Sequence, residues 1–549
     1  SRACLENAFC KMCVTVCGTF ISDEGVVAGY DNRIRDKSPA KWGVQIAGMI
    51  FQTRSSVQEV FLLYCKKQHL KSFAKEKTMV FSSMIFLWIF LPLVLLIYYV
   101  SPQKFRNGVL IFFSLLFYTW GEPRYILLML FSVTMNYAGG IFIEKYPVKR
   151  GRILGVTVTG NLLLLGYFKY LNFILELVRN LFFQGEEHIA FPEIALPIGI
   201  SFYTFQALSY VIDVYRGETE AQHNYGNMLL YISFFPQLVA GPIVKYQDMN
   251  WQILKRTVTF EKFAAGVMRF TWGLGKKVLL ANAFAKVVDN IYKYGPEAAT
   301  RKTLWLGAFL YMLQIYYDFS GYSDMAIGLG KMFGFDFQEN FRYPYVATSI
   351  RDFWRRWHIS LSSWFRDYVY IPLGGSKKGA YRTYRNLLIV FILTGIWHGA
   401  GVTFLLWGLY YGAFLILERV WLGKKLARLP AVLSWGYTMI VVFFGWILFR
   451  AEELPVFTSY VRNMFVQHGG ILPLSAYLDK KMLLLILMGV LLCGIGRIFW
   501  EKLGRRVPDM IQPAGVVTVP RILLCMLLFW LCVMALENNS YNPFIYFRF

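Results

Sequence analysis

The residue with the clearest chemical potential is a single histidine inside an apolar run. The run ends in Thr-Gly-Ile-Trp-His-Gly-Ala-Gly at residues 394–401, and His398 lies thirteen residues after Arg385, the last charge before it. In a helix that distance is about 20 Å, which is well inside a hydrocarbon layer about 30 Å thick. An ionisable ring at that depth costs free energy and indicates function. A neutral imidazole there can take the proton of an attacking hydroxyl; a histidine bonded between helices for structure alone is the alternative.

A second candidate segment, Arg351–Asp367, combines tryptophans with arginines around His358. Its large apolar side chains recur at spacings of 3, 4 and 3, which predicts one stripe of a single helix. They are Trp354, Trp357, Leu361 and Trp364. We expect this helix to lie flat at the cytoplasmic interface, with tryptophans in the acyl boundary and Arg355 and Arg356 at the headgroups. Taken alone, the pattern is also that of a plain anchoring helix.

Carboxylates occur within another apolar run. Asp318 and Asp324 are six residues apart, so one regular helix cannot present both on the same face. A break at Ser320-Gly321 would turn both toward one cavity. The alternative is that the two carboxylates pair with buried arginine or tyrosine side chains.

Proline and glycine interrupt further apolar runs, as they do in broken helices that line a cavity within a membrane protein. One such run is Pro197–Gln206, which contains Tyr203, and another is Phe235–Ile243. Asn340 precedes a proline that is expected to end a helix. The candidate substrate-binding or funnel-lining residues are therefore Tyr203, Gln206, Asp318, Ser320, Asp324 and Asn340.

The elements that position these residues must be membrane helices. Of the 549 residues, 56% are hydrophobic and 16% are charged, against about 25% charged in an ordinary globular domain. This composition excludes a soluble multidomain protein, a disordered chain and a coiled coil. The net charge of +24 comes from short basic clusters between apolar runs, which indicates loops beside an anionic membrane surface rather than nucleic-acid binding. The eight cysteines predict neither a disulfide framework nor a zinc site.

The pattern predicts an all-α polytopic membrane protein with roughly 10–13 transmembrane or re-entrant helices around a central funnel. The expected spans are 84–100, 108–120, 124–143, 153–183, 194–214, 227–244, 263–292, 303–333, 386–399, 402–421, 431–449, 481–500 and 520–537. Residues 1–78 lack these recurring apolar runs and are interpreted as an N-terminal extension. This extension is either a small cytoplasmic segment or a segment that precedes a natural start at Met79. Residues 79–549 are expected to form the membrane domain. Basic clusters near Arg150, Arg385 and Lys424 are expected in the cytoplasm.

Several ordered motifs of residues 79–549 resemble the membrane-bound O-acyltransferase family, and within it the bacterial branch that acetylates alginate or transfers D-alanine to teichoic acid. The motifs are Phe117-Tyr-Thr-Trp-Gly121, Pro197–Gln206, Gly241-Pro242, Asp318-Phe-Ser-Gly-Tyr-Ser-Asp324, Arg351–His358, Tyr370–Gly375, Trp397-His398-Gly399 and Asn542–Phe549. Residues 1–78 depart from the family pattern.

The resemblance implies roles that composition and spacing do not assign. His398 corresponds to the intramembrane active-site histidine of the family, and His358 to the second histidine on the cytoplasmic side of the same funnel. Trp397, a tyrosine or the backbone N–H groups near the glycines are the candidate donors to the oxyanion of a tetrahedral intermediate. Arg355 and Arg356 are candidates to attract the phosphates of the donor, although plain positive-inside topology explains them equally well.

The implied activity is O-acyl transfer in a bacterial cell membrane. An acyl thioester, acetyl-CoA in the alginate type, enters from the cytoplasm, and the acetyl group leaves toward an extracytoplasmic partner acetyltransferase or polysaccharide. No bound cofactor or metal is expected. D-alanyl transfer to teichoic acid, a transporter of the acyl donor and a structural scaffold for a polysaccharide synthase remain as alternatives.

Overall fold

The computed structural model describes residues 79–182, 194–466, 469–496, 518–538 and 541–545. Within these ranges the regular elements are helices, and the only β-type pairing is an isolated bridge between Ala299 and Leu472. The prediction of an all-α chain is confirmed. The proposed N-terminal extension lies outside the described residues. The chain divides into two units. Among the described residues, the first contains Met79 and Met84–Leu93, and the second contains Val80–Ser83 and the residues from Val94 onward. Every residue of the site described below belongs to the second unit.

The helices follow the predicted spans closely. In chain order they are α5 (Leu91–Val100), α6 (Arg106–Gly121), α7 (Ile126–Lys145), α8 (Arg150–Phe182), α9 (Ile200–Arg216), α10 (Tyr225–Ser233), α11 (Phe235–Leu238), α12 (Tyr246–Leu254), α13 (Phe260–Gly275), α14 (Asn282–Tyr294), α15 (Arg301–Met332), α16 (Ile350–Arg356), α17 (Ile359–Phe365), α18 (Ala380–His398), α19 (Val402–Leu417), α20 (Gly423–Leu426), α21 (Ala431–Arg450), α22 (Leu454–Phe465), α23 (Lys480–Val490) and α25 (Val519–Asn538). Short π-helical turns continue several of them, such as Lys276–Ala281 between α13 and α14.

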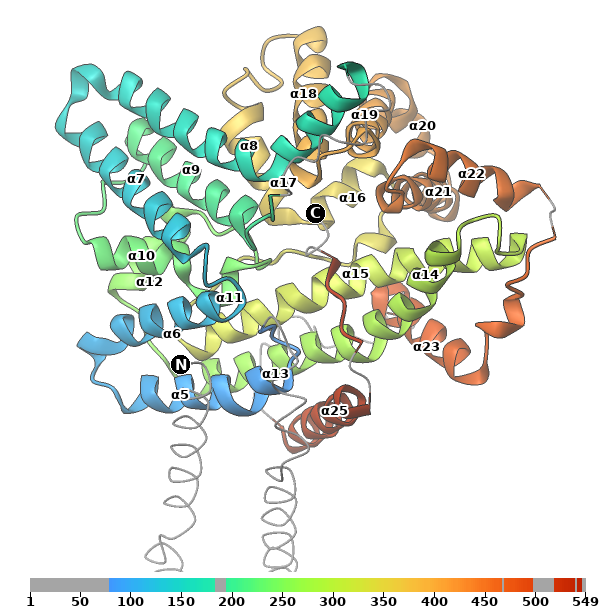
Figure 1. Cartoon of the computed structure of the whole chain (residues 1–549), viewed down its shortest axis with the longest axis horizontal. Helices are drawn as coiled ribbons and strands as arrows, with labels where there is room; N and C mark the ends of the chain where they lie inside the picture. Colours follow the sequence, from blue (N-terminus) through green and yellow to red (C-terminus); the bar gives the residue numbers. More distant parts are fainter. Residues whose placement is uncertain (1–78, 183–193, 467–468, 497–517, 539–540, 546–549) are drawn as a thin grey trace, which may run out of the picture. The chain divides into compact units, whose positions relative to one another are not determined.

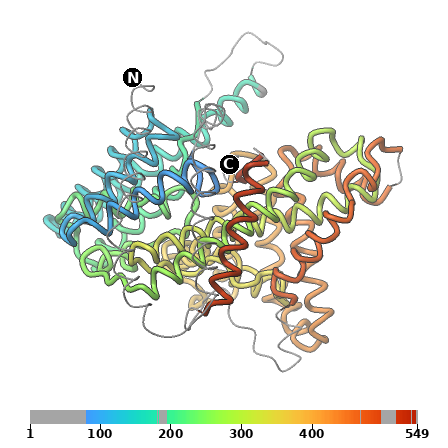
Figure 2. Tube along the Cα trace, turned by 90° about the horizontal axis from the view of Figure 1, so that it is seen from below, coloured from blue at the N-terminus to red at the C-terminus, as the bar shows by residue number. Residues whose placement is uncertain are grey.

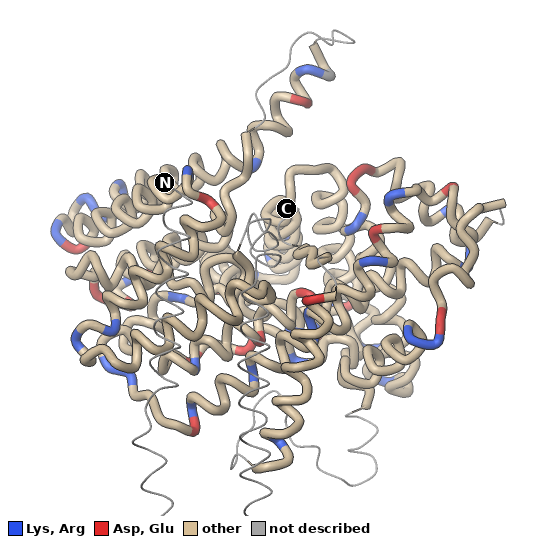
Figure 3. Tube along the Cα trace, turned by 60° about the horizontal axis from the view of Figure 1, so that its bottom comes forward, with Lys and Arg blue, Asp and Glu red and all other residues tan. Residues whose placement is uncertain are grey.

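Five helical segments of the described residues are long and apolar enough to cross a membrane. They are Ile126–Lys145, Pro147–Arg179, Val402–Leu426, Ala431–Arg450 and Val519–Asn538. Positions with lysine, arginine, aspartate or glutamate gather mainly toward helix ends and connections, and long stretches between them carry none (Figure 3). This distribution is typical of helices whose middle portions lie in hydrocarbon.

The centre of the second unit is the pair α13 and α15, which run side by side (Figure 1). Glycines let the two backbones touch: a Cβ on Gly273 would lie 2.5 Å from the carbonyl oxygen of Gly321, and one on Gly328 would lie 2.6 Å from that of Gly266. Small residues serve this purpose in membrane helix pairs. Helix α25 packs against α13, and it crosses the bundle in the second view (Figure 2).

Helix α15 corrects one prediction, because it continues from Arg301 to Met332 without a break at Ser320-Gly321. The glycine serves the contact with α13 instead of breaking the helix, since a Cβ on Gly321 would lie 2.8 Å from the carbonyl oxygen of Gly273. Asp318 and Asp324 therefore stay on different faces of one regular helix.

The segment before α18 corrects a second prediction. The expected single helix over 351–367 is split into α16 and α17 at His358, whose φ of 45° lies in the left-handed region. The tryptophans of the predicted stripe are buried in protein and do not face outward to an acyl boundary: Trp354 is 8%, Trp357 3% and Trp364 5% exposed. The break is stabilised by bonds from the Arg342 and Ile359 amides to carbonyl oxygens across it.

Candidate active site

His398 lies at the closed end of a helical hairpin. Helix α18 ends at His398, the next three residues Gly-Ala-Gly turn the chain, and α19 returns alongside α18 (Figure 1). The two helices are in backbone contact, because a Cβ on Gly395 would lie 2.3 Å from the carbonyl oxygen of Phe404. The open end of the hairpin carries basic residues on both arms, Arg382 on α18 and Lys424 after α19. The histidine is thus placed a full helix length, about 28 Å, from that basic end.

Aromatic rings from three helices surround the imidazole of His398, which is 5% exposed. The ring centroids of Trp407 on α19 and Phe449 on α21 both lie 5.1 Å from it in edge-on orientation. The ring of Trp397 lies 5.0 Å away. Such edge-on contacts fix the plane of a ring by packing. They leave the histidine preorganised on rigid helices.

A cavity of about 60 Å³ opens beside His398. Its walls come from α8, the start of α9, the segment before it and the end of α18. The lining residues are Lys169, Leu196, Pro197, Ile198, Gly199, Ile200, Ser201, Phe202, Val239, Trp397 and His398. The chain can bend there because Gly199 has a φ of 78°, which a side chain would disfavour. The Pro197–Gln206 motif therefore does line a cavity, as predicted, but with its first half.

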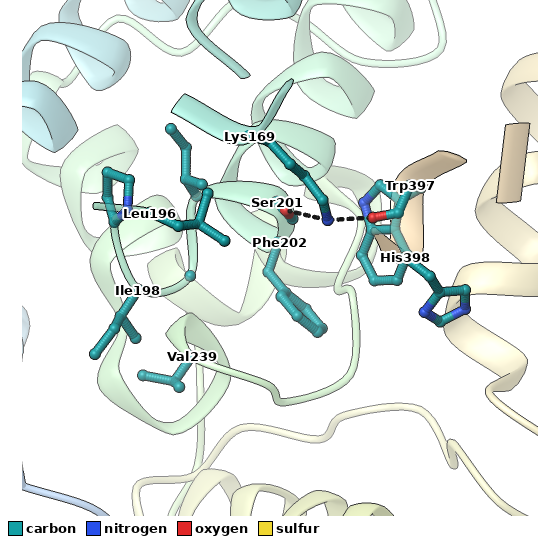
Figure 4. A pocket seen from close by; sticks show the side chains of 11 residues that line it. Lys169, Leu196, Ile198, Ser201, Phe202, Val239, Trp397 and His398 are labelled. Carbon is teal, nitrogen blue, oxygen red and sulfur yellow. Dashed lines mark hydrogen bonds between the residues drawn. The ribbon is translucent and has the colours of Figure 1, made fainter. Parts of the chain in front are cut away.

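In this cavity the side-chain nitrogen of Lys169 faces the hydroxyl of Ser201 and the backbone carbonyl of Trp397 (Figure 4). The ammonium of Lys169 donates to the carbonyl oxygen of Trp397 and lies 3.4 Å from the hydroxyl of Ser201. It also lies 5.5 Å from the centroid of the Trp397 indole. Lys169 and His398 line the same cavity. The cavity thus combines an imidazole, a lysine amine and a hydroxyl.

His358 is held by Asn340. The Oδ1 atom of Asn340 accepts hydrogen bonds from the backbone amide and hydroxyl of Ser360, at 3.1 and 2.9 Å, and lies 3.2 Å from Nδ1 of His358. Since that oxygen can only accept, Nδ1 carries the hydrogen and Nε2 is left as an acceptor. Among the described residues Nε2 has no hydrogen-bond partner. His358 lies outside the predicted spans, and burial lowers its pKa to about 3, so the ring is neutral.

The two histidines share one neighbour. The indole of Trp397 lies 6.1 Å from His358 and 5.0 Å from His398, measured between ring centroids. The structure thus brings three of the predicted residues together around one aromatic ring. The roles assigned to them by resemblance remain proposals.

Asp318 and Asp324 do not lie beside the cavity that His398 lines. Asp324 pairs with Arg269 and with Lys276, each at 2.6 Å, and Asp318 pairs with Lys277 and accepts from the backbone amide of Ile545 at 2.8 Å. Neither lines the cavity beside His398. The prediction that a helix break turns both carboxylates toward one cavity is wrong. The alternative of a buried arginine partner is confirmed for Asp324, whereas Asp318 pairs with a lysine.

The other predicted residues lie apart from the cavity as well. Tyr203 and Gln206 are buried on α9, and Ser320 is buried on α15. Arg355 is exposed, and Arg356 is held at 2.9 Å by Asp352 in its own helix. None of these five lines the cavity that holds His398.

Lys169 and Ser201 are the site residues that the sequence reading missed. The sequence predicts a membrane span over 153–183 that contains Lys169, but the apolar pattern does not single this residue out. An ionisable residue inside an apolar helix is itself a signal of function. Only the fold shows that α8 brings it to the end of α18.

Comparison with known proteins identifies the family of this chain. The model of the membrane-bound O-acyltransferase family matches residues 219–457, which include both histidines, and a family of unknown function matches residues 5–62. The chain is similar to the probable alginate O-acetylase AlgI of Pseudomonas putida, at 40% identity over 86% of this chain and 100% of that protein. It is 31% identical to a peptidoglycan O-acetyltransferase of Helicobacter pylori, over 84% of this chain and 90% of that protein.

A teichoic acid D-alanyltransferase of Bacillus subtilis is more distant, at 28% identity over 46% of this chain and 69% of that protein. The full-length similarity to O-acetylating proteins, together with the family match over the two histidines, makes this chain an acyltransferase and a multi-pass membrane protein. It belongs to the membrane-bound O-acyltransferase family.

Proposed function

We propose that this protein is the membrane O-acetyltransferase of a bacterial cell membrane that passes acetyl from a cytoplasmic thioester, acetyl-CoA, toward an extracellular polysaccharide or a partner acetyltransferase. The observation that carries the proposal is His398, a buried histidine that lines a cavity at the closed end of the α18–α19 hairpin. Alginate-type acetylation is the preferred form, because the similarity to alginate O-acetylases spans their whole length.

The arrangement suits attack of a hydroxyl on a thioester. The imidazole of His398 takes the proton as the acceptor oxygen bonds to the acyl carbon, and it returns a proton to the departing thiolate. The aromatic rings around the imidazole limit its contact with water, which strengthens the electrostatic interactions at the reacting carbon. A neutral His358 on the other side of Trp397 is placed to accept a hydrogen bond through Nε2.

The cavity has room for a short acyl group. Its volume of about 60 Å³ exceeds the roughly 10–15 Å³ that a cavity needs to hold one water molecule. A two-carbon acetyl group fits this space beside His398. The donor and acceptor themselves are the parts of the proposal that an experiment must identify.

The test uses inverted membrane vesicles from bacteria that produce the full chain and a surface polysaccharide. Radiolabelled acetyl-CoA is supplied to the cytoplasmic face, and label bound to the polymer as base-labile ester is counted. We expect ester formation that depends on the protein. D-alanyl ester from a D-alanyl carrier-protein thioester, with no acetyl ester, would overturn the proposal in favour of the teichoic acid type. Uptake of intact thioester without cleavage would support a transporter instead.

A further inference from the structure

Lys169 is a basic residue with no carboxylate partner among the residues that the structure describes. It lies on the long apolar helix α8, within one of the segments that can cross a membrane. Two other lysines of the second unit do have carboxylate partners: Lys277 pairs with Asp318, and Lys276 pairs with Asp324. No acidic group lies within salt-bridge distance of Lys169 among the described residues. Because an uncompensated ammonium inside an apolar span is costly, its charge calls for a functional explanation.

Capping of α18 accounts for the position of Lys169 but not for its charge. The last carbonyl groups of a helix lack backbone donors. Here Tyr170 donates to the Ile396 carbonyl oxygen at 2.7 Å, and Lys169 donates to that of Trp397. The neutral hydroxyl of Tyr170 shows that an uncharged donor suffices at this helix end. An ammonium has three hydrogens, and the cavity lies on its open side.

We propose that Lys169 is a further catalytic residue: its ammonium, held between the Trp397 carbonyl and the Ser201 hydroxyl, binds the carbonyl oxygen of the acyl group attacked beside His398. The inference rests on the proposed function. As the acceptor oxygen bonds to the acyl carbon, the π electrons of the carbonyl move to its oxygen, and His398 takes the hydroxyl proton. The oxyanion then re-forms the carbonyl, the carbon–sulfur bond breaks, and the thiolate leaves with the proton held by His398. The positive charge of Lys169 is matched to the intermediate in which the oxygen is negative.

The position of Lys169 relative to His398 also supports this role. Lys169 and His398 line one small cavity from two different helices, α8 and α18, so an acyl group bound in that cavity lies near both residues. Ser201 is buried, at 8% exposed, and restrains the ammonium from the third helix, α9. Figure 4 shows the side-chain nitrogen of Lys169 between Ser201 and Trp397.

The test compares three variants of the full chain in the vesicle assay, with kcat and KM for acetyl-CoA measured separately. Lys169→Gln keeps an N–H donor for the Trp397 carbonyl but removes the charge. We expect it to fold and to lose about 100-fold in kcat with little change in KM, as removal of an oxyanion donor does. Lys169→Arg keeps the charge and should retain kcat within about tenfold. Tyr170→Phe, which removes the neighbouring cap, should stay within about threefold.

Protein amount and thermal unfolding of each variant separate folding from chemistry. A Lys169→Gln protein that unfolds at the wild-type temperature and keeps its kcat overturns the inference. So does a result in which Lys169→Gln and Tyr170→Phe lose stability and activity in parallel, because a shared capping role then explains both. If the wild type transfers D-alanyl instead of acetyl, the proposed function fails, and the same three variants measured with that donor still decide the role of Lys169.

Discussion

At the residue scale, the site depends on side chains that hold the two histidines rather than on the histidines alone. The Oδ1 atom of Asn340 serves three buried donors, namely the amide and hydroxyl of Ser360 and Nδ1 of His358. Its amide nitrogen lies 3.1 Å from the hydroxyl of Ser323 on α15. Asn340 therefore fixes the orientation and the tautomer of His358 and ties the α16–α17 break to the central helix.

Replacing Asn340 by alanine is expected to reduce both stability and activity. The change leaves several buried donors without an acceptor, and each costs about 1–3 kcal/mol. We predict a lower midpoint of thermal unfolding and at least a tenfold loss of acetyl transfer, since His358 is no longer held. Gln338→Ala is the matched control, because Gln338 is exposed and bonds only to Asp248 among the described residues. Wild-type stability and activity in the Asn340→Ala protein would contradict this role.

The sequence could predict that His398 is buried but not the contacts around it. Depth in an apolar run follows from counting residues. Contacts such as those of Asn340 with His358 and of Lys169 with Trp397 join residues that are 18 and 228 positions apart. These contacts depend on how the helices pack, and a single sequence does not show which helices pack together. Ion pairs of Asp318 and Asp324 were open to two interpretations for the same reason.

At the element scale, the apolar runs located the long helices, whereas apolar periodicity failed at the short helices α16 and α17. Spacings of 3, 4 and 3 hold on both sides of His358, so the pattern continues through a point where the backbone turns. The turn is made by a non-glycine residue with positive φ, and non-local bonds to the segment at 340–342 stabilise it. Burial of tryptophans inside the bundle, rather than against lipid, follows from the same turn.

The α18–α19 hairpin positions His398. The close packing of its two helices can be tested at one glycine. An alanine at Gly395 would place Cβ 2.3 Å from the Phe404 carbonyl oxygen, and overpacking of this kind costs about 1–3 kcal/mol. We predict that Gly395→Ala lowers the thermal stability measured in detergent and reduces acetyl transfer at least tenfold. Gly436→Ala on α21 is the control, because nothing lies within 4 Å of its added Cβ. Equal behaviour of the two variants would count against a tightly packed hairpin.

At the scale of the whole molecule, charge and length together predict how the chain crosses the membrane. Helix α21 has 20 residues and is one of the segments able to cross. Lys424 and Lys425 precede it, and Glu452 and Glu453 follow it. The positive-inside rule then places the open end of the α18–α19 hairpin in the cytoplasm and His398 toward the opposite side. That placement agrees with a reaction that accepts acyl groups from one side and delivers them to the other.

Cysteine labelling tests this orientation. Lys424→Cys and Glu452→Cys both introduce a thiol at an exposed position. We expect a membrane-impermeant maleimide to label Glu452→Cys in intact spheroplasts and Lys424→Cys only in inverted vesicles, after subtraction of the labelling of the unsubstituted chain. Labelling of both variants from the same side would show that α21 does not span the membrane.

The central claim is that His398 handles the proton of the reaction, and His398→Ala tests it most directly. The variant and the wild type are produced at matched levels in the membrane, and acetate ester on the surface polysaccharide is measured. His223→Ala is the control, because His223 is exposed and pairs with Glu144 at 2.9 Å on the surface. The account predicts that ester falls to background in His398→Ala and stays at the wild-type level in His223→Ala. Wild-type ester content in a correctly folded His398→Ala protein would contradict it.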